Sequence, residues 1–104
     1  MELLIALTTF PDKERATDAA RILVEEKLCA CVNILPGVTS LYVWEGKSCE
    51  DSEVLALIKT SADKASELER RLLELHPYDT PEFILLSPAS VNERYLSWAL
   101  NYLK

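Results

Sequence analysis

The feature that most constrains this chain is a long segment of β character in its middle, CACVNILPGVTSLYVWEGKSCEDSEVLALIKT, residues 29–60. The only two glycines of the sequence lie within it. Pro36 and Gly37 predict a bend in the first strand, and Gly46 predicts the turn of a hairpin. Residues 30–45 alone would extend about 50 Å at ~3.3 Å per residue, whereas a compact domain of this length measures roughly 35 Å across. We therefore expect a hairpin that overhangs its own domain or pairs beyond it.

Segments of strand and helix character alternate around this hairpin. Residues 2–10 and 53–59 are apolar on both faces, which is typical of central strands. In the rest of the chain, apolar residues at helical spacing predict helices over residues 12–28, 61–76 and 90–103. One short apolar run predicts a strand over residues 82–87. The order β-α-β-β-α-β-α is that of a ferredoxin-like, split βαβ sandwich of the α+β class. Residues 1–104 have room for a single domain.

Three local interactions are expected at the helices. Asp12 is a candidate N-cap for the first helix. Ser90 and Glu93 have the spacing of a capping box at the start of the last helix. Glu67 and Arg71 are separated by one helical turn on the middle helix, which favours an ion pair between them.

Charge and motif content disfavour several function classes. Seventeen acidic residues against eleven basic ones give a net charge of −6, which disfavours a nucleic acid partner because phosphates carry the same sign. No apolar run approaches the ~20 residues that span a membrane, and no secretory signal is visible, so we expect a cytoplasmic protein without a membrane partner. The chain lacks a glycine-rich nucleotide-binding loop and a G-x-S-x-G nucleophile motif. An enzymatic function is therefore disfavoured.

The three cysteines, Cys29, Cys31 and Cys49, are an odd number, which favours reduced thiols over a disulfide framework. Cys29 and Cys31 lie two residues apart on a predicted strand, so their sulfurs are expected on one face. Such a pair is able to bind a soft ion such as Cu(I). It is also able to pack in the core as two small apolar side chains. We favour the core, and metal binding stays open.

The sequence HPYDTPE, residues 76–82, contains the only histidine of the chain and two of its five prolines. His76 ends a predicted helix and precedes a proline, which disfavours continuation of the helix. The residue is a candidate metal ligand or base, and the alternative is a helix-terminal residue in a stiff connector. Asp79 and Glu82 supply oxygen donors, but their spacing in an extended segment does not by itself bring them together.

Large apolar side chains occupy both faces of the predicted hairpin arm. Tyr42 and Trp44 alternate with Leu41 and Val43, so each pair lies on its own face. A small domain has few helices with which to cover two such faces, and an exposed apolar patch usually marks an oligomer interface. We therefore assign Tyr42 and Trp44 to a subunit interface and expect that a single subunit is not stable by itself.

Four blocks of the sequence, ACVNILPGVTSLYVWEGK, EVLALIKT, HPYDTPE and YLSW, resemble the CutA divalent-cation-tolerance family in sequence, order and spacing. The resemblance extends from Leu3 to about Leu100. It implies a ferredoxin-like domain assembled as a homotrimer, with an architecture similar to that of PII signalling proteins and with hairpin strands that pair between subunits. It also implies a link to the tolerance of copper and other divalent metal ions.

Within this resemblance, the histidine of the H-P-Y block corresponds to His76. Some members of the family bind copper near this histidine and have a cysteine at the end of the strand before the T-x-P segment. This chain has Thr8 there, which is a poor copper ligand. The resemblance therefore implies weak binding of copper or another divalent cation, with His76 as at most one of the ligands.

The resulting interpretation is a trimeric protein that is not an enzyme and that acts as a binding or signalling module in the response to metal ions. A PII-like sensor of a small anionic metabolite is one alternative, with an intersubunit cleft lined by Trp44, Glu53, Lys59 and Tyr78. A structural trimeric scaffold for partner proteins is the other alternative.

Overall fold

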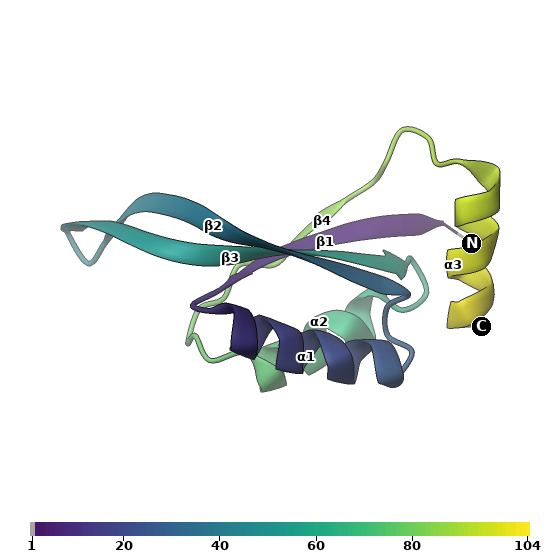
Figure 1. The fold of residues 1–104 in the computed structure, drawn as a ribbon, viewed down its shortest axis with the longest axis horizontal. Coiled ribbons are helices and arrows are strands. Elements are labelled where there is room, and N and C mark those ends of the chain that lie inside the picture. The colour runs from purple at the N-terminus through teal and green to yellow at the C-terminus, as the bar shows by residue number, and fades with distance from the viewer. Residues whose placement is uncertain (1) are drawn as a thin grey trace.

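A computed structural model describes residues 2–104, and its elements follow the order expected from the sequence. They are β1 (Leu3–Phe10), α1 (Lys13–Glu25), β2 (Cys31–Trp44), β3 (Lys47–Ser61), α2 (Ala65–Leu75), β4 (Ile84–Leu86) and α3 (Glu93–Leu103). The predicted α+β class is therefore confirmed, and the long β segment does form two strands of one hairpin (Figure 1).

The strands form one antiparallel sheet in the order β2-β3-β1-β4. Residues Leu3–Phe10 of β1 pair with Ser61–Val54 of β3, and three residues of β1 also pair with β4. The two strands that were apolar on both faces are thus the central ones. This arrangement of two crossovers around a hairpin confirms the split βαβ topology.

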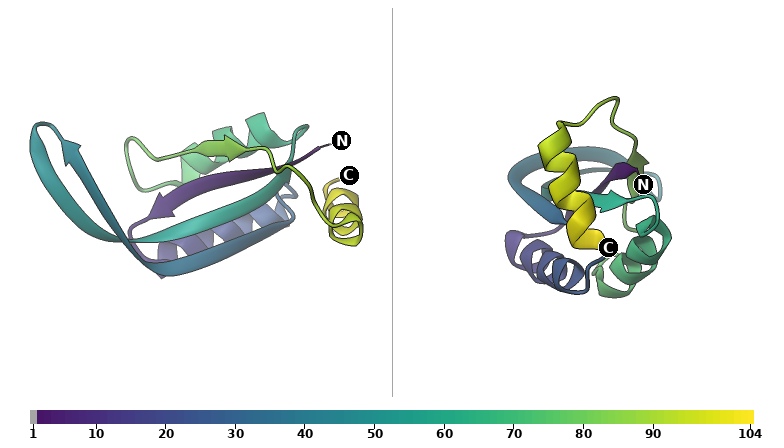
Figure 2. Two further views of the ribbon diagram at one scale, coloured as in Figure 1. Left: turned by 90° about the horizontal axis from the view of Figure 1, so that it is seen from above. Right: turned by 90° about the vertical axis from the view of Figure 1, so that its right-hand side faces the viewer.

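Helices α1 and α2 lie side by side on one face of the sheet (Figures 1 and 2). The core between them and the sheet takes alternate residues of each central strand, as the strand period of two requires. Its buried members are Ala6, Phe10, Ala16, Ala19, Leu23, Leu28, Cys29, Val54, Ala56, Ile58, Leu68 and Leu72. Helix α3 lies apart, across the end of the sheet where β1 begins, with Ala99 and Leu103 packed against Leu3 and Ala30.

No helix among residues 2–104 covers the centre of the opposite face of the sheet (Figure 2, left). We call this surface the open face. It carries apolar residues of all four strands that pair directly across the sheet, such as Leu7 with Leu57 and with Ile84. Leu35 and Leu86 of the edge strands are 41% and 45% exposed. The chain by itself therefore leaves one apolar side of its sheet exposed to water.

The hairpin formed by β2 and β3 extends beyond the rest of the molecule, as Figure 1 shows at its left side. Strand β1 ends at Phe10, opposite Val54, and the two hairpin strands continue without it as a two-stranded ribbon. The molecule consequently measures 44 × 26 × 22 Å. The overhang expected from the length of the segment is confirmed.

A β-bulge bends the first hairpin strand at the expected position. Leu35 pairs with Leu55, but the next pair joins Val38 to Glu53, so β2 has one residue more than β3 at this point. Gly37 has a φ of +79°, a conformation that costs little only without a Cβ. The extra residue reverses the alternation of side chains along β2. Even-numbered residues after the bulge, such as Val38, therefore lie on the same face of the sheet as odd-numbered residues before it, such as Leu35.

The local expectations at the helices are partly confirmed. The Asp12 carboxylate accepts a hydrogen bond from the Arg15 amide at 2.8 Å and caps α1. The capping box at Ser90 is wrong, because the Asn92 side chain caps α3 and accepts hydrogen bonds from the amides of Arg94 and Tyr95 at 3.0 and 3.1 Å. Asn is among the best N-cap residues, and here it stands immediately before the helix.

The predicted pairing of Glu67 with Arg71 is also wrong. Arg71 makes two hydrogen bonds of 2.9 Å to the carboxylate of Glu26, which follows α1. A two-pronged bond between a guanidinium and a carboxylate has better geometry than a single contact along one helix. The bond joins the C-terminal end of α1 to α2.

Within residues 2–104, no helix is long and apolar enough to cross a membrane.

Candidate functional site

A cavity of about 540 Å³ lies between the hairpin ribbon and the connector that leads from α2 to β4. It forms because β3 continues past the end of β1, which leaves space beside the ribbon, and residues 77–82 pass along that space. Three aromatic side chains line it, Tyr42, Trp44 and Tyr78. Four carboxylates line it as well, Asp51 and Glu53 from β3 and Asp79 and Glu82 from the connector.

Two phenols of the cavity are hydrogen-bonded to two of its carboxylates. The Tyr78 hydroxyl donates to Glu53 at 2.7 Å, and the Tyr42 hydroxyl donates to Asp51. The bond to Asp51 is the main reason that the pKa of Tyr42 is raised to about 12, and burial is the main reason that the pKa of Tyr78 is also raised. Both phenols are therefore neutral donors at physiological pH, and both carboxylates are held in place.

His76 lies behind the cavity, with 8% of its surface exposed. Its Nε2 is 2.8 Å from the Thr9 carbonyl oxygen, which only accepts, so Nε2 carries the proton. Its Nδ1 accepts a hydrogen bond from the Tyr78 amide at 3.1 Å. The ring stacks on Phe10 with 4.4 Å between centroids. The partners of both nitrogens thus fix one neutral tautomer.

Burial lowers the pKa of His76, and it outweighs the opposite effects of the Thr9 carbonyl and the Glu53 carboxylate. The imidazole is therefore neutral, but neither nitrogen has an unused lone pair. The hydroxyl of Thr8 is 3.3 Å from Nε2, so the residue that the family resemblance singled out beside this histidine does adjoin it. Among residues 2–104, no group of three His, Cys, Asp or Glu side chains is arranged to hold a metal ion.

The structure brings together three of the four residues predicted to line a ligand cleft. Trp44, Glu53 and Tyr78 line the cavity, whereas Lys59 does not. The Lys59 ammonium lies on the open face, where it contacts the Asn33 amide oxygen and is 4.0 Å from the Cys31 sulfur. The cavity therefore contains no basic side chain among its described lining residues.

The cysteines occupy different environments. Cys29 precedes β2 and is fully buried in the core, where burial raises the pKa of its thiol to about 12. The interpretation as a core residue is confirmed for Cys29. Cys31 is half-buried on the open face beside Lys59, so the expectations that the two sulfurs share one face and that Cys31 packs in the core are wrong, because Cys29 precedes the strand and enters the core on the other side of the sheet. All three cysteines are free thiols.

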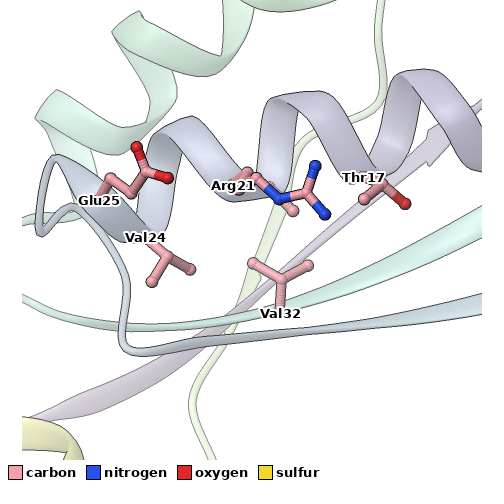
Figure 3. A pocket seen from close by; sticks show the side chains of 6 residues that line it. Thr17, Arg21, Val24, Glu25 and Val32 are labelled. Atoms are coloured by element: carbon pink, nitrogen blue, oxygen red, sulfur yellow. The ribbon is translucent and has the colours of Figure 1, made fainter.

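A second, shallower hollow of about 320 Å³ lies between α1 and the edge strand β2. Figure 3 shows Arg21 and Glu25 of the helix and Val32 of the strand around it. Its lining combines single charges of opposite sign with small apolar side chains. It lacks the concentration of aromatic and acidic groups that distinguishes the larger cavity.

The strand order, the two helices on one face and the overhanging hairpin define a ferredoxin-like, split βαβ protein. The chain belongs to the CutA family, because residues 4–101 match the family model described as CutA1 divalent ion tolerance protein. The divalent-cation tolerance protein CutA of Thermus thermophilus is 47% identical over 90% of this chain and 91% of its own. The protein of the same description from Pyrococcus horikoshii is 44% identical over 98% of this chain and 99% of its own.

Solved structures agree with this assignment. The crystal structure of CutA from Xylella fastidiosa superimposes with a TM-score of 0.96 at 36% identity and covers 100% of both chains. The crystal structure of the divalent ion tolerance protein CutA1 from Ehrlichia chaffeensis gives a TM-score of 0.94 at 33% identity, with 99% of this chain and 96% of the other covered. The likeness therefore extends over the whole domain, including the hairpin.

Proposed function

We propose that this chain assembles as a homotrimer that acts, without enzymatic activity, as a binding or signalling module in the tolerance of divalent metal ions. Membership of the CutA family supports the connection with divalent cations. The observation that carries the proposal of assembly is the amount of apolar surface that one subunit leaves uncovered, on the open face and on the hairpin.

The hairpin contributes the most exposed of these residues. Leu41 and Val43 are 72% and 68% exposed on the side of the ribbon that faces away from the cavity. Full burial of such side chains contributes about 1.5–3 kcal/mol each. A neighbouring subunit that covers Leu41 and Val43 together with the apolar centre of the open face would gain several such contributions, and we infer from this that assembly is obligatory. The choice of a trimer rests on the family resemblance.

The same structure supports only weak metal binding by His76. A strong copper site needs two or three nitrogen or sulfur donors, and this chain has one imidazole. Binding at Nδ1 would break the bond from the Tyr78 amide, and binding at Nε2 would displace the proton given to the Thr9 carbonyl. Each loss lowers the affinity for copper or another divalent cation.

The three free thiols suit a reducing compartment such as the cytoplasm.

Light scattering tests the assembly. We expect the wild-type protein to have a mass three times the 11.7 kDa of one chain. Leu41→Lys with Val43→Lys places two charges on the exposed side of the ribbon and should dissociate the trimer. Leu73→Lys on α2, a residue that is 47% exposed, serves as the control and should leave the mass unchanged. A folded wild-type monomer at micromolar concentration would refute the proposal.

Calorimetry with copper tests the metal site. We expect a dissociation constant weaker than about 1 µM, as a site with a single strong donor requires, and loss of binding in His76→Ala without a change in trimer mass. Submicromolar affinity that is lost in His76→Ala would contradict the claim of weakness. Affinity that is unchanged in His76→Ala would contradict the role of this residue and assign the metal to the cysteines.

A further inference from the structure

The cavity beside the hairpin combines aromatic faces with an excess of negative charge. Tyr42 and Trp44 come from β2, Tyr78 comes from the connector, and four carboxylates lie around them. Cavities that bind small ligands typically have volumes of about 300–1,000 Å³, so a cavity of about 540 Å³ is suitable for a small organic molecule. The arrangement of charge then decides which kind of molecule.

An anionic ligand does not match this cavity. A carboxylate or phosphate group would face four side chains of its own sign, and no lysine or arginine is among the described lining residues. Lys59, the cation that would have favoured an anion, is engaged with Asn33 and Cys31 on the open face. Like charges brought together in a partly closed site repel each other. The anionic metabolite considered from the sequence therefore lacks a partner within the subunit.

A bare metal ion does not match the cavity either. The four carboxylates come from two separate segments, with Asp51 and Glu53 on β3 and Asp79 and Glu82 on the connector. Among residues 2–104 they do not form a group of three donors around one point. Divalent ions such as Ca²⁺ and Mg²⁺ need several oxygen ligands within about 2.6 Å.

We propose that this cavity binds a small organic cation with one or more ammonium groups, of the size of a linear diamine or triamine. Ammonium groups are attracted to the faces of indole and phenol rings, and carboxylates on two sides suit a ligand with separated positive charges. The proposal rests on the proposed function, since it names the ligand class of the binding module. It depends on the charge of the cavity and not on the metal affinity of His76.

The four carboxylates have different tasks in this proposal. Asp51 and Glu53 accept the hydrogen bonds of Tyr42 and Tyr78, so they orient the rings as well as supply charge. Asp79 and Glu82 make no hydrogen bond or ion pair with any other side chain among residues 2–104. They are exposed and unpaired in the subunit, and they are the carboxylates that remain for an incoming cation.

Fluorescence of Trp44 provides a direct measurement of this binding. The chain has two tryptophans, so Trp98→Phe leaves Trp44 as the only indole. We expect putrescine and spermidine to change its emission in a saturable way, with spermidine the tighter ligand because it has more charge. Glutarate, a dianion of similar length, should produce no change. Magnesium chloride at equal ionic strength controls for screening. Calorimetry on the wild-type protein repeats the comparison without a tryptophan substitution.

A pair of matched double variants tests the role of the carboxylates. Asp79→Asn with Glu82→Gln removes two charges at the cavity and should weaken spermidine binding by about tenfold or more. Asp63→Asn with Glu69→Gln removes the same net charge from the exposed turn before α2 and from α2 itself. That control should bind spermidine as the wild type does.

Three results would overturn the proposal. The first is an equal loss of spermidine affinity in the two double variants. The second is binding of glutarate that is as tight as binding of spermidine. The third is that the amines produce neither a fluorescence change nor a calorimetric signal. Light scattering of each variant is measured in parallel. A trimer that does not bind amines contradicts this inference alone, whereas a monomer contradicts the proposed assembly.

Discussion

Protonation of His76 is expected to destabilise the native protein, because burial lowers the pKa of the imidazole from its ordinary value of 6.5. Both ring nitrogens are engaged in the neutral form, and a proton added to Nδ1 would turn the bond from the Tyr78 amide into a contact between two donors. The unfolded chain takes up this proton near its ordinary pKa, and the folded chain resists it. Stability is thus complete well above pH 6.5, and it is lost as the pH falls through that value.

The size of this effect has an upper limit. One proton bound by the unfolded chain and not by the folded one changes the free energy of unfolding by about 1.36 kcal/mol per pH unit. Between pH 7.0 and 5.5, the loss can reach about 1.3 kcal/mol if the folded imidazole stays neutral throughout. His76 is the only histidine of the chain, and carboxylates titrate mainly at lower pH. The change in this interval therefore reports on His76.

Urea unfolding at several pH values and at constant protein concentration measures this prediction. His76→Gln serves as the comparison, because glutamine does not titrate. The variant should be less stable at pH 7, by about 2–4 kcal/mol for the lost hydrogen bonds and ring stacking. Its stability should, however, be nearly independent of pH between 7.0 and 5.5. A wild-type protein with no loss of stability in this interval, or an equal slope in the variant, would refute the reasoning.

Three further predictions concern single side chains. Arg71→Lys removes the two-pronged bond to Glu26. It should lower the melting temperature at low salt, and it should lower it much less at about 1 M salt, where screening is strong. An equal decrease at both salt concentrations would contradict an electrostatic cause. The Cys29 thiol, with a pKa raised to about 12 by burial, should react with a thiol reagent only after unfolding, and rapid reaction in the native state would contradict its burial. Thr8→Cys places a sulfur beside the Nε2 of His76, which is 3.3 Å from the threonine hydroxyl in the present chain. Calorimetry should show that the variant binds copper at least about tenfold more tightly than the wild type does. Unchanged affinity would show that the buried pair is not accessible to the ion.

The order of the elements was predictable because apolar periodicity reflects which sides of a segment are buried. The two central strands were recognisable in this way, since both of their faces carry apolar residues. Contacts between distant segments were not predictable from the same rules. Arg71 contacts Glu26, 45 residues earlier, because α1 and α2 pack side by side. Rules for neighbours on one helix contain no information about the second helix.

The candidate site was predictable in part for a similar reason. Lys59 has the same parity as Glu53 and lies on the same face of β3, which alternation indicates correctly. The two residues are six positions apart, however, and therefore about 20 Å apart along the strand. Asp51 was not predicted as a partner of Tyr42, because the contact depends on the register of the hairpin. That register includes the bulge at Gly37.

The bulge at Pro36 and Gly37 has a consequence for how the length of this hairpin can change. One additional residue in β2 determines that Tyr42 and Trp44, and not Leu41 and Val43, lie on the side of the cavity. Deletion of a single residue of β2 between the bulge and the turn would exchange the two sides of the arm for the residues of β2 that follow it. Deletion or insertion of two residues would preserve them. We therefore expect related chains to differ in this arm by even numbers of residues.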